Sequence, residues 1–578
     1  MQTKPVTATP CQIMVDQLAA SGIEHVFYNP GSREALFFDA LQQHPGINGV
    51  ISLHEGSVAS MAGGYAQTKA APAIMVVHLG AGLAQALGQF INVWYGGLPV
   101  VVITFAGDTG SFADRINLDL NHSFGPTSIA APMMKANWTV IEPEGIPQAI
   151  YRAIQVAKTP PMGPVHLAIY DRLLGHEQTT TEIINGAPAD LLAGYPADKD
   201  IDAVAQALHN AERPLLYVGD GVWKSGAEAT VTQLAESFGL PIAIDWGELR
   251  SVSLTHPQHC DQLDLAAAEL KPDLILCLGI RHSGSGNRND FDAVKDAKQV
   301  IAIGSHVENL KSLGGLDQAI LADEGRTAQR LLDWLDAQKT TAAHYDNRRT
   351  WAENSATKLR ERLTDAARSA PKESGRVRPW VLSDTLDRVL DAQGGGIIAI
   401  EQYAAPLNCI GNIRRDSRNT YLQAPGASEG WGIGATIGAK LAAPAKTVVG
   451  LVGDGSFCYA DNGVWSAAHH NIPVLYVIPN NGAYGIVANS FLRAEGTMAQ
   501  TGDYASVTLG GIDLLQVAAG FGLEGQRVIE ESELEAALIH GLTVVNEKRQ
   551  PYMLDVRLPL GLPSGGQTAE EYKFREKS

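Results

Sequence analysis

Short runs of apolar, largely β-branched residues alternate with segments of helical length along the whole chain. Examples are HVFYN (25–29), AIMVVHL (73–79), LILCLG (274–279), GGIIAIE (395–401) and KTVVGLVGD (446–454). Because these runs are apolar on both faces, they are typical of parallel strands buried between layers of helices. The pattern therefore predicts an α/β fold.

The runs fall into three groups, separated by two stretches with the composition of linkers. Residues 185–200 are rich in Pro, Gly and Ala, and residues 337–374 are charged and helical. We expect three Rossmann-like modules with parallel sheets flanked by helices, at residues 1–185, 196–340 and 375–560. Residues 561–578 form a C-terminal tail, for which a frayed end and a segment folded over a site are both open.

Composition narrows the class of protein and of partner. The chain of 578 residues is too long for one core and fits three or four domains of about 150 residues. A net charge of -18 argues against nucleic acid or an anionic membrane as partner, so we expect a small-molecule partner. Five scattered cysteines without a C-x-x-C pair indicate neither disulfides nor zinc, and no apolar stretch is long enough to span a membrane. We expect a cytoplasmic protein.

The stretch GLVGDGSFCYA (450–460) places Asp454 between two glycines at the end of a predicted strand. A helix-length segment and a second apolar run follow, and the second run ends at Asn480 and Asn481. A parallel strand–helix–strand unit brings the carboxyl ends of its strands to one edge of the sheet, so Asp454 and Asn481 should lie close together. A second triplet, Gly219-Asp220-Gly221, has no such asparagine 27 residues later, and we interpret it as a turn that ends a strand.

Carboxylate and amide oxygens are suitable ligands for Mg²⁺, which also binds phosphate oxygens. Glycines beside Asp454 allow backbone N–H groups to approach a diphosphate closely. The segment therefore predicts a magnesium-diphosphate site.

Gly-Asp-Gly followed by Asn-Asn at this spacing resembles the motif of the thiamine-diphosphate-dependent 2-oxo acid decarboxylase and acetohydroxyacid synthase superfamily. The resemblance covers nearly the whole chain and implies pyrimidine-binding, middle and diphosphate-binding domains in that order. It implies thiamine diphosphate and Mg²⁺ as cofactors, with Asp454, Asn481 and the backbone carbonyl of Ala483 as metal ligands. It also assigns further residues to cofactor binding, namely Gly453, Gly455, Ser456, Tyr484, Gly485, Ile486 and Ala427.

Glu55, in ISLHEGSVASMAGGYAQ, lies between a predicted strand and a predicted helix. By itself such a carboxylate is commonly a solvated charge at a helix N-terminus. The Gly63-Gly64-Tyr65-Ala66 that follows it resembles the segment after the catalytic glutamate of the family. The resemblance implies that Glu55 protonates N1' of the cofactor and so favours the tautomer that removes the thiazolium C2 proton.

Within the superfamily, YNPGSREALFFDAL and VVHLGAG are most similar to the benzoylformate decarboxylases. Ser32 and His78 are the matching positions. The Ser32 hydroxyl can bind a substrate carboxylate, and the His78 imidazole can transfer protons. A turn residue and a satisfied core histidine are the alternatives.

Two positions depart from the family pattern. Glu429 stands where a bulky apolar residue usually supports the bent cofactor, and it can stabilise a cation, pair with a basic substrate, donate a proton, or point away while Trp431 or Ile433 supports the cofactor. The middle-domain histidine of the benzoylformate decarboxylases has no secure counterpart. Arg281 and His282 lie near its place but are offset, and we interpret them as surface loop charges.

The segment NGAYGIVANSFLRAEGT, after the asparagines, lines the substrate pocket in the family, and the stiff Ile486 and Val487 predict an apolar wall that favours smaller or mixed substrates. The resemblance implies decarboxylation of a 2-oxo acid, with or without carboligation to a second carbonyl. A carboligase or carbon–carbon lyase of the acetohydroxyacid synthase or acyl-CoA lyase type, and a catalytically silent subunit, are the alternatives. In the family Glu55 and the Mg²⁺ site belong to different subunits, which implies at least a homodimer and favours a homotetramer.

Overall fold

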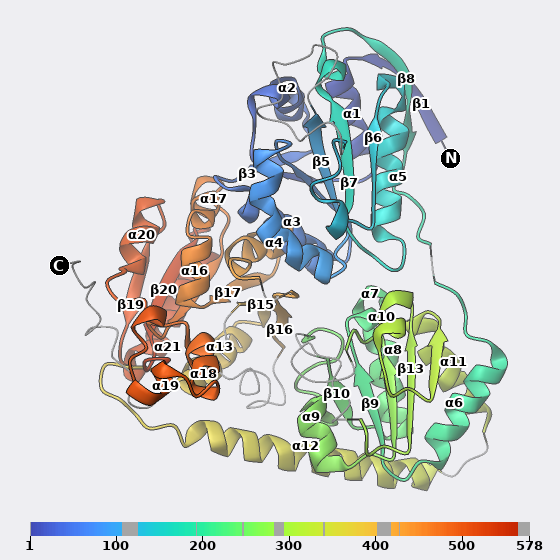
Figure 1. Cartoon of the computed structure of the whole chain (residues 1–578), viewed down its shortest axis with the longest axis vertical. Coiled ribbons are helices and arrows are strands. Elements are labelled where there is room, and N and C mark those ends of the chain that lie inside the picture. Colours follow the sequence, from blue (N-terminus) through green and yellow to red (C-terminus); the bar gives the residue numbers. More distant parts are fainter. Residues whose placement is uncertain are drawn as a thin grey trace.

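A computed structural model gives the arrangement of most of the chain (Figure 1). The described residues are 2–106, 125–191, 193–245, 248–282, 294–338, 342–401, 418–426 and 428–563. They form three six-stranded sheets and one two-stranded sheet. Every strand pairing within the three large sheets is parallel, which confirms the predicted α/β class.

The N-terminal domain contains the first large sheet, in the order β3-β2-β4-β5-β7-β6. Its strands are β2 (His25–Tyr28), β3 (Asn48–Ile51), β4 (Ala73–Val76), β5 (Val100–Ala106), β6 (Ala136–Val140) and β7 (Val165–Tyr170). Its helices are α1 (Pro10–Ala20), α2 (Ala35–Gln43), α3 (Glu55–Lys69), α4 (Ala81–Tyr95) and α5 (Ile146–Lys158), with a 3₁₀ turn η1 (Ser32–Glu34). An antiparallel pair, β1 (Gln2–Ala8) and β8 (Thr179–Asn185), joins the two ends of this domain.

The middle domain contains the second sheet, in the order β11-β10-β9-β12-β13-β14. Its strands are β9 (Pro214–Val218), β10 (Ile242–Ile244), β11 (His259–Gln262), β12 (Leu274–Leu278), β13 (Gln299–Gly304) and β14 (Gln318–Leu321). Its helices are α6 (Asp198–Asn210), α7 (Gly221–Lys224), α8 (Glu228–Phe238), α9 (Leu263–Leu270), α10 (Val307–Ser312) and α11 (Glu324–Ala337).

The C-terminal domain contains the third sheet, in the order β16-β15-β17-β18-β20-β19. Its strands are β15 (Gly396–Glu401), β16 (Thr420–Gln423), β17 (Thr447–Val452), β18 (Leu475–Asn480), β19 (Gly525–Val528) and β20 (Tyr552–Arg557). Its helices are α13 (Pro379–Ala392), α15 (Gly432–Ala442), α16 (Asp454–Tyr459), α17 (Gly463–His469), α18 (Gly485–Arg493), α19 (Thr497–Thr501), α20 (Leu514–Gly520) and α21 (Glu531–Asn546).

The charged stretch before the C-terminal domain forms one long helix, α12 (Ala342–Arg368). In Figure 1 this helix runs beneath the middle domain towards the C-terminal domain. The strands of each sheet fall within one of the three predicted modules, and the exact domain boundaries stay predictions.

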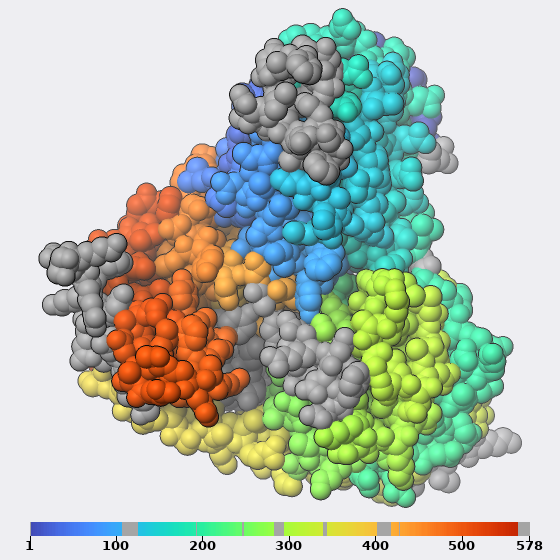
Figure 2. Space-filling model, in the orientation of Figure 1, coloured from blue at the N-terminus to red at the C-terminus, as the bar shows by residue number. Residues whose placement is uncertain are grey.

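The N-terminal and C-terminal domains pack against each other through α3 and α15, and Figure 2 shows them in direct contact. Gly64 of α3 faces the backbone of Ala435 of α15, and Gly434 of α15 faces Ser60 of α3. A side chain on either glycine would collide with the opposite helix, so the glycines permit this close approach. Apolar residues of both domains, including Phe90 of α4 and Ile437 of α15, form one continuous core.

Candidate active site

The predicted metal ligands lie at the carboxyl edge of the C-terminal sheet. β17 and β18 are neighbouring parallel strands, and Asp454 and Asn481 follow their ends. Asp454 begins α16, and both side chains are buried. The structure thus brings the two residues together as the strand–helix–strand geometry predicts.

The Asn481 side-chain amide faces two other oxygen atoms at this edge. The side-chain oxygen of Asn481 lies 2.8 Å from Oδ1 of Asp454 and 3.0 Å from the carbonyl oxygen of Ala483. All three are hydrogen-bond acceptors, so the arrangement requires either a rotated Asn481 amide that donates two hydrogen bonds or a cation among the oxygens. One carboxylate, one amide and one backbone carbonyl form a donor set that fits Mg²⁺.

Burial raises the pKa of Asp454 to about 7, although the N–H of Gly482 donates a hydrogen bond of 2.9 Å to its Oδ2. A divalent cation would favour the ionised carboxylate and reverse this effect of burial. Among the described residues, no group of three or more His, Cys, Asp or Glu side chains could hold a metal ion. A metal at Asp454 therefore depends on the amide and carbonyl ligands.

A pocket of about 340 Å³ opens beside Asp454 and Gly482. Its lining includes the glycine pair Gly510 and Gly511, the cationic residues Arg376 and Arg557, and the carboxyl groups of Asp454 and Asp513. Cationic side chains and an exposed glycine backbone suit an anionic group such as a diphosphate.

Ser456 and Glu429 meet beside this site. The Ser456 hydroxyl, on α16, donates a hydrogen bond to the Glu429 carboxyl group. Burial raises the pKa of Glu429, and this hydrogen bond opposes the shift. Glu429 thus points towards α16, and Trp431 and Ile433 are buried in the core between the domains.

The segment before α15 is held by two side chains of α4. Asn92 Oδ1 accepts hydrogen bonds from the N–H groups of Gly426 and Ser428, at 3.0 and 3.1 Å. Gln89 Nε2 donates to the backbone carbonyl of Glu429. The N-terminal domain thereby fixes the backbone that carries Glu429. Ala427, which was assigned to the cofactor, lies outside the described residues.

Glu401 is a buried carboxyl group that the sequence analysis missed. It ends β15 and accepts hydrogen bonds from the N–H groups of Trp431 and Gly432, at 2.9 and 2.6 Å. Burial and the neighbouring Glu429 raise its pKa to about 8. A charged residue directly after an apolar strand, the position that also identified Asp454, is the signal that could have revealed it.

Glu55 is the first residue of α3, after the N-cap His54, whose Nδ1 accepts a hydrogen bond from the N–H of Gly56. Oε1 of Glu55 lies 3.0 Å from the position that a Cβ atom on Gly82 would occupy. Cβ of His78 lies 3.1 Å from the same position. Glu55 and His78 therefore flank the first turn of α4, and Gly82 provides the space between them.

Ser32 begins η1 and is exposed, close to a second buried carboxyl group that the sequence analysis missed. Glu34 ends the same 3₁₀ turn, and its Oε1 lies 2.8 Å from Nδ1 of His78. The structure thus places the predicted residues Ser32 and His78 in one corner of the N-terminal domain, with Glu34 between them.

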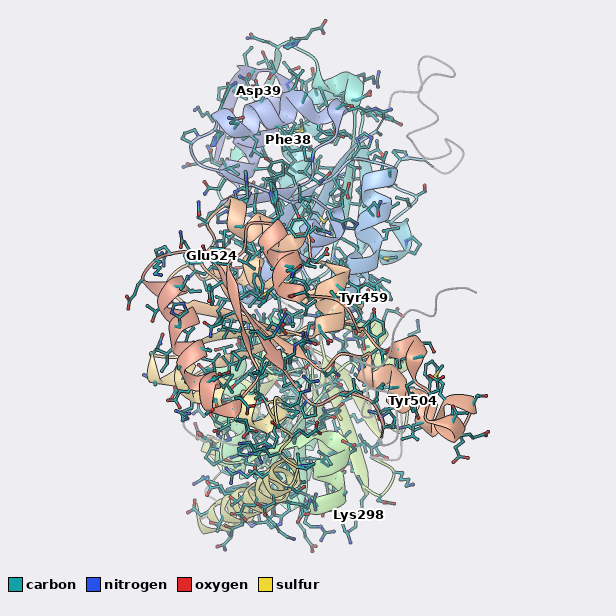
Figure 3. All side chains as sticks on the ribbon, turned by 90° about the vertical axis from the view of Figure 1, so that its left-hand side faces the viewer. Phe38, Asp39, Lys298, Tyr459, Tyr504 and Glu524 are labelled. Carbon is teal, nitrogen blue, oxygen red and sulfur yellow. The ribbon has the colours of Figure 1, made fainter. Side chains whose placement is uncertain are left out.

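Residues after Asn481 form the boundary of the site on another side. The Tyr484 ring covers Gly455, and Gly485 begins α18. Ile486 and Val487 are 51% and 42% exposed, so the described residues do not enclose the predicted apolar wall. In Figure 3, Tyr459 and Tyr504 lie on the side of the molecule where the small helices α18 and α19 project.

The start of the C-terminal tail touches the predicted metal site. The Gly561 N–H donates a hydrogen bond of 3.1 Å to the backbone carbonyl of Asn481. The tail from residue 564 lies outside the described residues.

The interpretation of Arg281 and His282 as surface loop charges is wrong. Arg281 forms an ion pair with Asp220, and its Nη1 donates a hydrogen bond of 2.5 Å to the backbone carbonyl of Tyr95 in the N-terminal domain. His282 stacks on the Tyr95 ring, and its Nε2 lies 2.6 Å from the Tyr95 hydroxyl oxygen. Both residues lie between the middle and N-terminal domains, a position that sequence spacing cannot reveal.

Known protein families match the chain in the same three-part order. Residues 9–123 match the N-terminal TPP binding domain of thiamine pyrophosphate enzymes, residues 201–331 their central domain, and residues 410–556 their C-terminal TPP binding domain. The chain belongs to the thiamine pyrophosphate enzymes. The superfamily resemblance on which the cofactor prediction depends is thereby confirmed.

Two curated relatives illustrate the range of this thiamine pyrophosphate enzyme family. The benzoylformate decarboxylase of Pseudomonas aeruginosa is 27% identical over 545 residues, which cover 91% of this chain and 95% of the relative. The acetolactate synthase isozyme 1 large subunit of Escherichia coli is 26% identical over 550 residues, which cover 92% of this chain and 91% of the relative. The two relatives carry different activities at nearly the same identity.

Solved structures of thiamine pyrophosphate enzymes share the fold. A thiamine diphosphate-dependent 4-hydroxybenzoylformate decarboxylase of Rhodococcus jostii RHA1 matches with a TM-score of 0.77 and 23% identity, over 96% of this chain and 99% of that one. A benzoylformate decarboxylase of Polynucleobacter necessarius matches with a TM-score of 0.78 and 19% identity, over the same shares.

Among the described residues, no helix is long and apolar enough to cross a membrane.

Proposed function

We propose that this chain is a Mg²⁺- and thiamine-diphosphate-dependent enzyme that decarboxylates a 2-oxo acid. The observation that carries the proposal is the convergence of the buried Asp454 carboxylate, the buried Asn481 amide and the Ala483 carbonyl at the carboxyl edge of the C-terminal sheet. Burial disfavours the ionised Asp454 carboxylate, and a bound Mg²⁺ would favour it, so this donor set supports a metal-dependent enzyme.

Asp454, Asn481 and the Ala483 carbonyl would hold Mg²⁺, and Gly453, Gly455 and Ser456, at the N-terminus of α16, would contact the diphosphate. Tyr484, Gly485 and Ile486 would border the cofactor. Thiamine diphosphate, when bound, supplies the electron sink for cleaving the bond between the keto carbon and the carboxylate.

The protein would supply proton transfers and orientation. Glu55, at the start of α3, would exchange a proton with N1' of the pyrimidine ring. His78 would transfer protons at the substrate carbon or oxygen, and the Ser32 hydroxyl would hydrogen-bond the substrate carboxylate. Glu429, whose pKa is raised by burial, would act as an additional proton donor near Ser456.

A carboligase or carbon–carbon lyase is the second candidate. The similarity to an acetolactate synthase is nearly as high as that to a benzoylformate decarboxylase, which supports it. In a carboligase, the carbon that a decarboxylase protonates after loss of carbon dioxide would instead bond to the carbonyl carbon of a second substrate. Glu429 would then donate a proton to the oxygen of that second carbonyl group.

The decisive experiment reconstitutes the apoprotein with Mg²⁺ and thiamine diphosphate and offers a panel of aliphatic and aromatic 2-oxo acids, with and without aldehydes. Carbon dioxide and carbonyl products are measured together. Aldehyde and carbon dioxide in equal amounts support the decarboxylase, and 2-hydroxy ketones as the main product support the carboligase. Cofactor binding without turnover of any substrate would indicate a silent subunit, and no cofactor binding would contradict the whole proposal.

Glu55→Gln tests the role of the carboxylate separately from substrate choice. The variant should bind thiamine diphosphate but lose exchange of its C2 proton with deuterium, measured by NMR of the quenched cofactor. Glu24→Gln, a change at the exposed partner of Lys69, is the matched control and should leave the exchange rate unchanged. Equal exchange in both variants would contradict the assignment of Glu55.

We also propose a homodimer or homotetramer. The contact between α3 and α15 lies within one chain, so it gives no evidence for an interface between subunits. Ile91 and Trp94, on α4, are 38% and 48% exposed, which supports a surface that another copy covers. Light scattering after size-exclusion chromatography measures the mass.

The described cysteines are free and support a reducing, cytoplasmic environment.

A further inference from the structure

Glu34 and His78 form a buried pair in the N-terminal domain. Oε1 of Glu34 lies 2.8 Å from Nδ1 of His78, and the side chains are 1% and 16% exposed. A carboxyl group so completely buried requires a specific partner, because burial without one costs several kcal/mol. The only partner that the structure gives the described Glu34 carboxyl group is the imidazole, while its Oε2 is buried without a hydrogen bond.

The turn that carries Ser32 is packed directly on this pair. A Cβ atom on Gly31 would lie 2.5 Å from Oε2 of Glu34 and 2.5 Å from Nδ1 of His78. Only glycine leaves room for both groups at this place, so the Pro30-Gly31-Ser32 backbone closes the pair on one side. The carboxyl group, the imidazole and the turn are therefore one rigid unit.

The geometry also separates the two nitrogens of the His78 ring. An ionised carboxylate can only accept a hydrogen bond, so with Glu34 ionised the 2.8 Å contact places the proton of the neutral imidazole on Nδ1. The other nitrogen, Nε2, is then the atom at which His78 gains and loses its proton. Glu55 lies on the other side of Gly82, and Arg33, within η1, forms an ion pair with Asp171.

We propose that Glu34 is the positioning residue of His78: it fixes the Nδ1–H tautomer and the plane of the ring, so that proton transfer runs through Nε2. The role rests on the proposed function for its catalytic consequence, while the tautomer is a property of the protein alone. Fixing the tautomer would matter because a histidine with its proton on the wrong nitrogen cannot accept one at the reacting atom.

The tautomer is measured on apoprotein labelled with ¹⁵N-histidine, by long-range ¹H–¹⁵N correlation, and His78→Phe identifies the signal. Wild type should show the Nδ1–H form. Glu34→Leu should convert His78 to the Nε2–H form or to a mixture. Nε2–H in wild type, or Nδ1–H retained in Glu34→Leu, would overturn the proposal. Since no substrate is needed, this result is independent of the proposed function.

Activity measures the consequence. Glu34→Leu should lower kcat about 10- to 100-fold with KM nearly unchanged. Glu34→Gln keeps an acceptor for Nδ1–H and removes the charge, so it should retain more activity, and the limb of the pH profile that reports His78 should move down by about one pH unit. Equal kcat in Glu34→Leu and wild type would contradict the positioning role.

Asp39→Asn, on α2, is the matched control. Asp39 is an exposed carboxylate five residues from Glu34, and Figure 3 shows it at the outer surface of the N-terminal domain. It should change neither the tautomer nor kcat. Circular dichroism of each variant tests folding, and if Glu34→Leu does not fold, Glu34→Gln decides: an unchanged pH profile in that variant overturns the proposal.

Discussion

The chain contains the triplet Gly-Asp-Gly twice, and the two copies have similar positions and opposite electrostatics. Asp220 follows β9 and Asp454 follows β17, each at the carboxyl end of a central parallel strand and at the start of a helix. Asp220 lies beside Arg281 and Lys224, which lower its pKa to well below the usual range against the effect of burial. Burial raises the pKa of Asp454 to about 7.

The difference shows that the triplet specifies a position and not a function. In the middle domain the carboxylate already has its cations, two side chains of the same chain. Lys224 and Arg281 also donate to the backbone carbonyls of Gly96 and Tyr95, so the cluster joins the middle domain to the C-terminal end of α4. In the C-terminal domain burial disfavours the ionised form of Asp454, and the Mg²⁺ that we propose would favour it.

The largest expected effect is that of Asp220→Asn. The change leaves Lys224 and Arg281, whose side chains are only 16% and 15% exposed, without their carboxylate and should lower the free energy of unfolding by about 3–5 kcal/mol. Asp454→Asn removes a carboxyl group that burial already disfavours in its charged form, so the apoprotein should be equally or more stable. Urea denaturation of both apoproteins measures the difference.

Cofactor binding should show the opposite order. Asp454→Asn should abolish the rise in Tm that Mg²⁺ and thiamine diphosphate together cause, while Asp220→Asn should retain it. Equal stability losses in the two apoproteins, or a retained Tm rise in Asp454→Asn, would contradict the distinction between the two triplets.

Gly221→Ala is expected to have the next largest effect. A Cβ atom at residue 221 would lie 2.7 Å from the Gly279 Cα atom and 2.5 Å from Oε1 of the buried Glu324. Backbone cannot move away as a side chain can, so the variant should lose about 1–3 kcal/mol of stability. Gly226→Ala is unsuitable as a control because its φ is +67°. Gly145→Ala meets nothing within 4 Å and should change urea stability by less than about 0.5 kcal/mol.

Much of the fold could be predicted because its strands are apolar on both faces. The exposed pair β1 and β8 and four edge strands, β6, β11, β16 and β19, were missed, since polar residues interrupt their pattern. Asp454 and Asn481 could be paired because they follow two parallel strands joined by one helical crossover, which contains α16 and α17.

The remaining site residues depend on contacts that no local pattern records. Asp220 and Arg281 lie 61 residues apart and meet only when β9 and β12 pair in the sheet. The environment of Glu401 likewise depends on the position of the segment that contains Trp431 and Gly432. That of Glu34 depends on the packing of η1 against His78. Pattern therefore predicts which strand ends lie together, and tertiary packing decides whether a carboxylate there is neutralised by the chain or left for a ligand.

Glu401→Gln tests the pH dependence that follows from this contrast. The folded protein holds a proton on Glu401 up to about pH 8, whereas the unfolded chain releases it near 4.5. The folded state therefore binds more protons in this window, and the free energy of unfolding should fall as the pH rises from about 4.5 to about 8. Asp220 behaves oppositely: its pKa is lowered, so its stabilisation is present above about pH 4 and lost in acid.

In Glu401→Gln the fall in apoprotein stability between pH 5 and 8 should become smaller, because the variant has no carboxyl group to ionise at residue 401. It should not vanish, since Asp454 contributes in the same direction. Chemical denaturation at several pH values gives the slope. Glu535→Gln, at the exposed partner of Arg388, is the control. An identical slope in Glu401→Gln and wild type would show that Glu401 is ionised in the fold.

Gly455→Ala should have the smallest effect on stability, and it is the counterpart of Gly221→Ala. A Cβ atom there would lie 2.6 Å from Cε1 of Tyr484, which is a partly exposed side chain and can rotate away. Alanine is also the better helix former, by about 1 kcal/mol, so the loss of apoprotein stability should be under about 1 kcal/mol. The methyl group would nevertheless stand where the backbone is expected to approach the diphosphate, and calorimetric titration with Mg²⁺ and thiamine diphosphate should show weaker binding. If Gly455→Ala lost as much stability as Gly221→Ala and bound the cofactor as tightly as wild type, both triplets would serve only packing. The C-terminal triplet would then not belong to the cofactor site.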